Sequence, residues 1–164
     1  MMVGAGDRTV TFERFFRDEY PRLVPMLQAL TGDRQRAEDL AQDALAAAQR
    51  DWRRIGRYDK PGAWVRRVAL NRSSNDRRRQ RREAASLQRI GVAEPTTETA
   101  GHDARLWALV RALPEQQRWA VALHYVEDRS VADVAEVLGC SAGTVKTHLS
   151  RARETLARQL EGRP

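Results

Sequence analysis

The spacing of apolar and polar residues predicts helices along most of the chain. In the first half, apolar side chains recur every three or four positions in three segments, at about residues 12–31, 34–52 and 62–82. We expect Pro21 to kink or interrupt the first segment, because proline has no backbone N–H to continue the helical hydrogen bonds. Residues 11–82 are therefore predicted to form a small helical domain.

The second half shows the same spacing in four shorter segments. Pro114 separates the first two, and the last two flank a short turn at Gly139. Ser130 and Ser141 are each placed to cap the helix that follows. Two short helices joined by a glycine-containing turn are typical of a helix-turn-helix. Residues 103–161 are therefore predicted to form a second small domain that contains this motif.

Residues 83–102 lie between these domains and have no apolar period. They contain Gly, Pro and Thr and carry net negative charge, a composition that favours a flexible linker. The predicted fold class is all-α, with two small helical domains joined by a flexible linker.

The outward face of the last helix has the chemistry of a DNA-binding surface. Between residues 142 and 153 there is no carboxylate. If Val145 faces inward, small, polar and basic residues fall on the opposite side. They are Gly143, Lys146, Thr147, Ser150 and Arg151. Such groups suit a major groove and its phosphates, although an ordinary helical hairpin with a solvated face is the alternative.

The overall charge also favours nucleic acid as the partner. The net charge is +7, and 31% of the residues are charged. There is no long apolar run and no export signal, and the single cysteine fits a reducing compartment, so we expect a cytoplasmic protein without membrane contact. The histidines and Cys140 show no metal-ligand or nucleophile spacing. We therefore expect no metal, no cofactor and no enzymatic activity.

Two charged regions in the first half have opposite signs. The second helix carries Glu38, Asp39, Gln42 and Asp43 on its polar side, which is either a solvated face or a docking face for a basic protein. The third helix is rich in arginine, against the single acid Asp76. Its basic residues are Arg66, Arg67, Arg72, Arg77, Arg78, Arg79, Arg81 and Arg82. They predict contacts with a phosphate backbone, although residues 77–82 could be a non-specific basic tail.

The loop at residues 52–61 combines basic and aromatic side chains between the second and third helices. Such a mixture can hold backbone phosphates and stack on unpaired bases. Together with the third helix, it predicts a surface for single-stranded nucleic acid.

Three stretches, residues 31–45, 64–71 and 125–153, resemble bacterial sigma factors of the sigma-70 family. The similarity is greatest to the short extracytoplasmic-function type (group 4), in a SigE-like subfamily, and covers nearly all of residues 11–160. It implies that residues 11–82 are region 2, which binds core RNA polymerase, recognises the −10 element and melts DNA. Residues 103–161 would be region 4, which recognises the −35 element and binds the polymerase flap.

The resemblance also implies roles for individual residues. Those implied to dock on the clamp helices of the largest polymerase subunit are Asp39, Gln42 and Asp43. Those implied in −10 recognition and melting are Arg57, Tyr58, Asp59, Lys60, Trp64, Arg67, Asn71 and Arg78. For the −35 element, Ser141 and Thr144 join the residues assigned above from helical spacing. The implied partners are core polymerase and promoter DNA, both duplex and single-stranded, and an anti-sigma factor is left open.

Two other functions are compatible with parts of the sequence. A stand-alone helix-turn-helix regulator accounts for residues 130–153 but gives the acidic patch and the arginine-rich helix no role. A non-specific DNA- or RNA-coating protein accounts for the arginines but predicts no sequence preference.

Overall fold

The computed structural model describes residues 10–90 and 102–162, and in these ranges every regular element is helical. The all-α fold class is thus confirmed. The N-terminal part contains α1 (Phe12–Thr31), α2 (Arg34–Arg50), α3 (Trp52–Ile55) and α4 (Pro61–Ile90). The C-terminal part contains α5 (His102–Arg111), α6 (Glu115–Val121), the π-helical turn η1 (Ala122–Val126), α7 (Val131–Leu138) and α8 (Ala142–Glu161).

Helix ends lie where the capping residues predict them. The side chains of Asp33, Ser130 and Ser141 each accept a hydrogen bond from a backbone N–H in the first turn of α2, α7 and α8. Gly139, with φ of 68°, ends α7 in the left-handed conformation that glycine adopts without strain. The helix-turn-helix is confirmed.

Pro21 does not interrupt α1, contrary to the sequence-based expectation. Both Pro21 and Pro25 lie inside a continuous helix, on its exposed side. There water can bind the carbonyls that lose their partners. The opposite side of α1 is held by a row of buried residues. They are Leu23, Val24, Met26, Leu27 and Leu30.

The predicted ends of two other elements were wrong. The expected loop at residues 52–61 begins with the short helix α3. Helix α4 extends to Ile90, so residues 83–90 of the expected linker are helical. They include Glu83, Ala84, Ala85 and Leu87, all strong helix formers, and the first glycine comes only at position 91. The rest of the expected linker, residues 91–101, lies outside the described residues.

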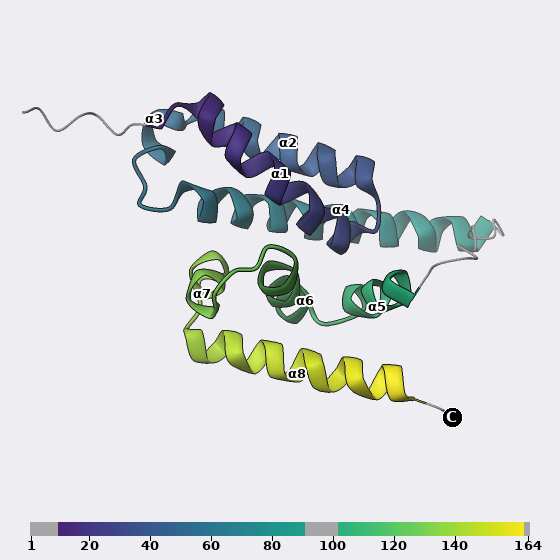
Figure 1. Cartoon of the computed structure of the whole chain (residues 1–164). Helices are drawn as coiled ribbons and strands as arrows, with labels where there is room; N and C mark the ends of the chain where they lie inside the picture. The colour runs from purple at the N-terminus through teal and green to yellow at the C-terminus, as the bar shows by residue number, and fades with distance from the viewer. Residues whose placement is uncertain (1–9, 91–101, 163–164) are drawn as a thin grey trace, which may run out of the picture.

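The two parts pack against each other in two layers. Helices α1, α2 and α4 form one layer, and α5 to α8 form the other (Figure 1). Across the interface, α1 contacts η1 and α5, while α4 contacts α7. The buried apolar side chains form one cluster that extends through both parts. Helix α8 packs on α5, α6 and α7, on the side that faces away from the N-terminal part (Figure 1).

Candidate nucleic-acid and polymerase interfaces

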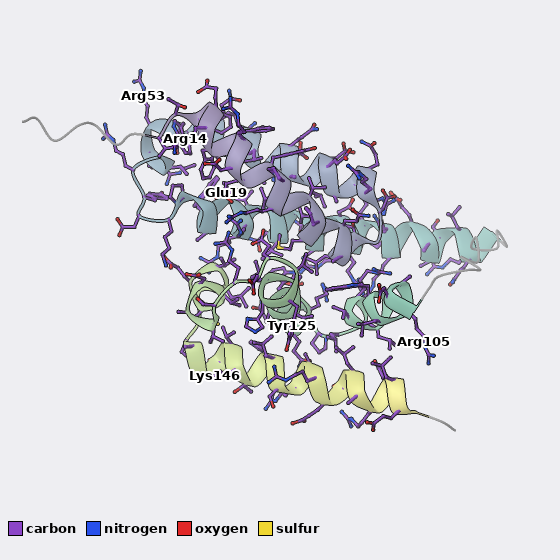
Figure 2. The ribbon with its side chains drawn as sticks, viewed as in Figure 1. Arg14, Glu19, Arg53, Arg105, Tyr125 and Lys146 are labelled. Atoms are coloured by element: carbon purple, nitrogen blue, oxygen red, sulfur yellow. The ribbon has the colours of Figure 1, made fainter. Side chains whose placement is uncertain are left out.

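The predicted −35 residues lie together on α8 and its cap. Val145, Leu149 and Ala152 are buried against the rest of the C-terminal part. On the other side Gly143, Lys146, Thr147 and Arg151 are exposed, and Ser150 is half-buried. Figure 2 shows Lys146 near the start of α8. The turn between α7 and α8 therefore presents the N-terminal half of α8 to solvent.

Hydrogen bonds already occupy some of the hydroxyls on this face. Ser141 Oγ accepts from the Thr144 backbone N–H at 3.1 Å and lies 2.9 Å from Thr144 Oγ1. Thr147 donates to the Gly143 carbonyl at 3.0 Å. Lys146 and Arg151 are the exposed charged side chains among the predicted −35 residues.

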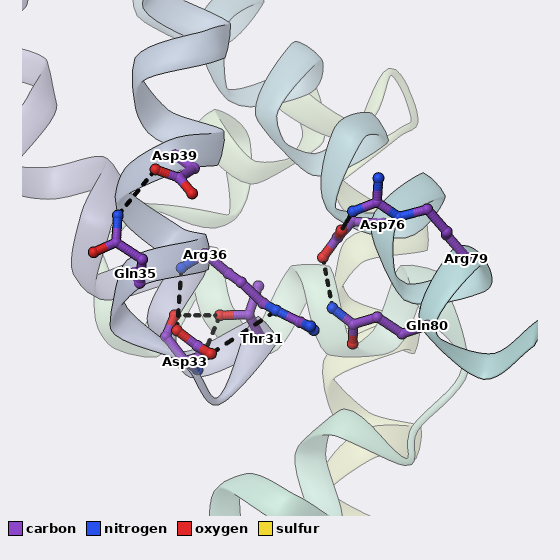
Figure 3. A network of polar contacts seen from close by, with 8 residues as sticks. All are labelled: Thr31, Asp33, Gln35, Arg36, Asp39, Asp76, Arg79 and Gln80. Carbon is purple, nitrogen blue, oxygen red and sulfur yellow. Dashed lines mark hydrogen bonds and ion pairs between the residues drawn. The ribbon is translucent and has the colours of Figure 1, made fainter. Parts of the chain in front are cut away.

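The predicted docking residues form an exposed patch on α2. Asp39, Gln42 and Asp43 are all exposed, while the opposite side of the helix is buried. Asp39 accepts a hydrogen bond from Gln35 at 3.1 Å, and Figure 3 shows this pair beside the capping network of Thr31, Asp33 and Arg36. Asp43 lies 3.7 Å from Arg72 of α4. The patch lies well away from α8, the predicted −35 surface (Figure 1).

The predicted melting loop follows α3. Arg57, Tyr58, Asp59 and Lys60 are all exposed. Arg54 donates to Tyr58 Oη at 2.6 Å, which orients the ring. Lys60 pairs with Glu136 at 2.5 Å and with Asp133 at 3.3 Å, both on α7. Hydrogen bonds to Glu136 and then Asp133 raise the pKa of Lys60 above its ordinary value.

The predicted −10 helix lies partly against the C-terminal part. On α4, Trp64 is half-buried, while Arg67, Asn71 and Arg78 are exposed. The Arg67 guanidinium is so close to Gly139 that a Cβ there would clash with it. Arg78 lies 3.7 Å from Glu115 of α6. Lys60, Arg67 and Arg78 thus each contact the C-terminal part.

Arg66 is not part of a phosphate-binding face, contrary to the sequence-based expectation. Its side chain is fully buried between Glu19 of α1 and Glu127, which follows η1, at 2.6 and 2.5 Å. Figure 2 shows Glu19 on α1. Burial opposes the charged form of Arg66, but the hydrogen bond and charge of Glu127, followed by those of Glu19, outweigh it and raise its pKa.

The sequence contained a signal for this burial. Arg66, Leu70 and Arg77 fall at i, i+4 and i+11, on one helical face, and Leu70 is a core residue. An arginine aligned with a core leucine is a candidate for a buried ion pair. Its partners come from distant segments, so spacing could not identify Glu19 or Glu127.

No helix in the described ranges is long and apolar enough to cross a membrane. Among the same residues, no group of three or more His, Cys, Asp or Glu side chains is arranged to hold a metal ion.

Comparison with known proteins assigns both parts of the chain. The family "Sigma-70 region 2" matches residues 15–83, and "Sigma-70, region 4" matches residues 103–156. The chain belongs to the sigma-70 family. We therefore call the N-terminal part region 2 and the C-terminal part region 4.

Relatives place this sigma factor in the extracytoplasmic-function type. It is 31% identical to the RNA polymerase sigma-E factor of Streptomyces avermitilis, covering 97% of this chain and 90% of the relative. It is 35% identical to the ECF RNA polymerase sigma factor SigM of Mycobacterium tuberculosis, covering 95% and 80%. Among solved structures, the sigma factor RpoE in complex with the anti-sigma factor NepR from Bartonella quintana matches with a TM-score of 0.70 and 25% identity, over 93% of this chain and 98% of that one. The protein is thus a sigma factor for transcription initiation.

Proposed function

We propose that this sigma factor binds core RNA polymerase through Asp39, Gln42 and Asp43, and recognises a promoter at two separate places. Region 4 binds the −35 element through α8. Region 2 binds and opens the −10 element through α4 and the loop before it. The protein does no bond chemistry itself and acts where the chromosome is transcribed, in the cytoplasm.

The observation that carries this proposal is the exposed face of α8. Val145, Leu149 and Ala152 are buried on its inward side, so Lys146 and Arg151 are directed to solvent. No Asp or Glu occurs between residues 142 and 153. Such a face fits the major groove, where Lys and Arg donate to guanine or phosphate. The remaining −35 contacts are assigned to Ser141, Gly143, Thr144, Thr147 and Ser150.

The loop before α4 supports a role in opening DNA. Tyr58 is 37% exposed, and its neighbours in the sequence are Arg57 on one side and Asp59 and Lys60 on the other. An exposed ring can stack on an unpaired base while neighbouring cations hold the backbone. Unstacking a base costs a few kcal/mol, which these contacts, together with Trp64, Arg67, Asn71 and Arg78, would offset.

Regions 2 and 4 pack against each other in the described structure, and we call this arrangement the closed form. The two regions must separate before the −10 element binds. Lys60, Arg67 and Arg78 each contact region 4, where single-stranded DNA would have to reach them. Core polymerase would hold the two regions apart. An anti-sigma factor, such as the one bound to the Bartonella quintana relative, would act as the opposing partner.

In vitro transcription tests this function. The purified chain is mixed with sigma-free core polymerase and a promoter fragment library, and open DNA is mapped with permanganate. We expect discrete start sites with reactive thymines near −10, and none with core polymerase alone. Absence of a stable complex and of any start site would overturn the proposal. Tight sequence-specific binding without polymerase would instead identify a stand-alone regulator.

A further inference from the structure

A basic pocket lies where regions 2 and 4 meet, between α4 and α6. It is open to solvent and has a volume of about 410 Å³. Region 2 contributes Ser74, Arg77, Arg78 and Arg81 from α4, and region 4 contributes Glu115 and Arg118 from α6. A volume of this size is in the range of small-molecule sites.

The pocket has an excess of positive charge. Four guanidinium groups face one carboxylate, Glu115, which lies 3.7 Å from both Arg78 and Arg118. Burial, followed by repulsion from Arg118 and Arg81, lowers the pKa of Arg77 to about 10. Arg77 therefore remains charged at neutral pH, and the cations stay crowded together without enough protein anions to compensate them.

Two polar groups in the pocket wall have no partner. Ser74 is only 4% exposed, and among the described residues neither its hydroxyl nor Arg77 Nε makes a hydrogen bond. Both atoms are covered, so a ligand reaches them only after a small rotation of these side chains, and satisfying such costly unpaired groups then adds to its affinity. Arg118 is also buried, at 8% exposed, and donates to the Leu113 carbonyl at 3.1 Å. That bond fixes the guanidinium in the wall.

We infer that this pocket binds an oligophosphate chain, either inorganic or carried by a nucleotide. Guanidinium groups bind phosphate oxygens in bidentate fashion, and several of them match the several charges of a di- or triphosphate. A single monoanion would leave most of the positive charge uncompensated. A DNA duplex is too broad to enter between α4 and α6. The single-stranded −10 element is proposed to bind Arg78 only after regions 2 and 4 separate, so the ligand of the closed form is a small molecule.

This ligand would hold the two regions together. Arg77 and Arg81 belong to region 2 and Arg118 to region 4, so a phosphate chain between them bridges the interface. Binding therefore stabilises the closed form, in which Lys60 and Arg67 contact region 4. It would oppose binding of the −10 element.

Isothermal titration calorimetry of the free full chain with sodium triphosphate tests the inference, at about 150 mM salt to screen non-specific attraction. We expect saturable binding of one equivalent. Arg81→Gln removes a charge from an exposed position, and Ser74→Ala removes the unpaired hydroxyl without removing charge. Each should weaken binding by about tenfold. The matched control is Arg53→Gln, since Arg53 projects from α3 into solvent (Figure 2), and it should leave binding unchanged.

These outcomes distinguish specific binding in the pocket from non-specific electrostatic attraction to the protein. No saturable binding, or equal weakening by Arg53→Gln and Arg81→Gln, would overturn the inference. Parallel titrations with ATP and GTP identify the source of the phosphate chain: tighter binding than triphosphate assigns a nucleotide, and equal or weaker binding assigns the inorganic chain. Because the readout is direct binding to the free chain, its failure leaves the transcription proposal intact.

Discussion

Arg66 of region 2 and Glu127 of region 4 form a buried ion pair, with 2.5 Å between Nε and Oε2. Glu19 binds the other side of the guanidinium, and the Gly62 carbonyl accepts a further hydrogen bond at 2.9 Å. Glu127 in turn accepts from Arg129 at 3.0 Å. Two guanidinium groups thus face two carboxylates at the interface, and their charges compensate one another in a largely buried cluster.

Replacement of Arg66 by Gln should destabilise the closed form strongly. Glu19 would lose its cation and the buried Glu127 would keep only Arg129, and loss of one partner of a buried pair typically costs about 3–5 kcal/mol. Urea unfolding measures the change. Arg82→Gln, at an exposed position on the same helix, should change the free energy of unfolding by less than about 0.5 kcal/mol. Equal small effects of both substitutions would show that the ion pair does not support the fold.

Release of Lys60 should strengthen binding of single-stranded −10 DNA to the free protein. Asp133→Asn with Glu136→Gln removes both partners of Lys60 on α7. We expect a modest increase in affinity, because exposed ion pairs are weak. Fluorescence anisotropy with a labelled oligonucleotide measures it. Asp103→Asn with Glu161→Gln makes the same charge change elsewhere in region 4. A gain of the same size there would mean that net charge, and not Lys60, is responsible.

Lys146→Ala and Arg151→Ala should each weaken −35 binding. If these side chains contact bases, each substitution costs about 1–3 kcal/mol. Anisotropy on a −35 duplex gives the change, and Arg158→Ala, exposed near the end of α8, serves as control. Affinity and footprints that both substitutions leave unaltered would contradict the assignment of this face.

Charge reversal on α2 should abolish polymerase binding without unfolding the protein. Asp39→Arg with Asp43→Arg inverts the docking patch, and both positions are exposed, so the helical circular dichroism should persist. Co-purification with core polymerase is the measurement. The control, Glu13→Arg with Asp18→Arg, makes the same charge change on exposed positions of α1. A docking-patch variant that still co-purifies would exclude these contacts.

Arg77 should make the stability of the free protein rise with pH through about 10. Its pKa is lowered by folding, so between that value and its ordinary one the unfolded chain binds more protons. The cost of keeping this partly buried charge is present below about pH 10 and is relieved above it. Urea unfolding at about pH 8 and about pH 11 should therefore show wild type gaining stability relative to Arg77→Gln. No relative gain would mean that folding does not perturb this arginine.

The helix-turn-helix and the exposed face of α8 could be predicted from sequence because their determinants are local. Ser141 caps the helix that it precedes, and Val145 and Leu149 are spaced to share one side. The same logic failed at Pro21, because burial on the far side of α1 outweighs a lost hydrogen bond on the exposed side. It failed again at residues 83–90, which are helical. The Gly, Pro and Thr residues that favoured a linker all lie after residue 90, whereas residues 83–90 contain strong helix formers.

By itself, the sequence determined most of the helical segments, which sides of them are apolar, and where opposite charges gather. Only the tertiary structure decided that Arg66 is buried, that Lys60 and Arg67 contact region 4, and that the arginines around Ser74 line a pocket. The physical reason is the distance along the chain over which each kind of interaction acts. Periodicity and capping connect residues within a few turns, whereas Arg66 meets Glu127 across 61 positions of the chain, through packing that no local pattern encodes.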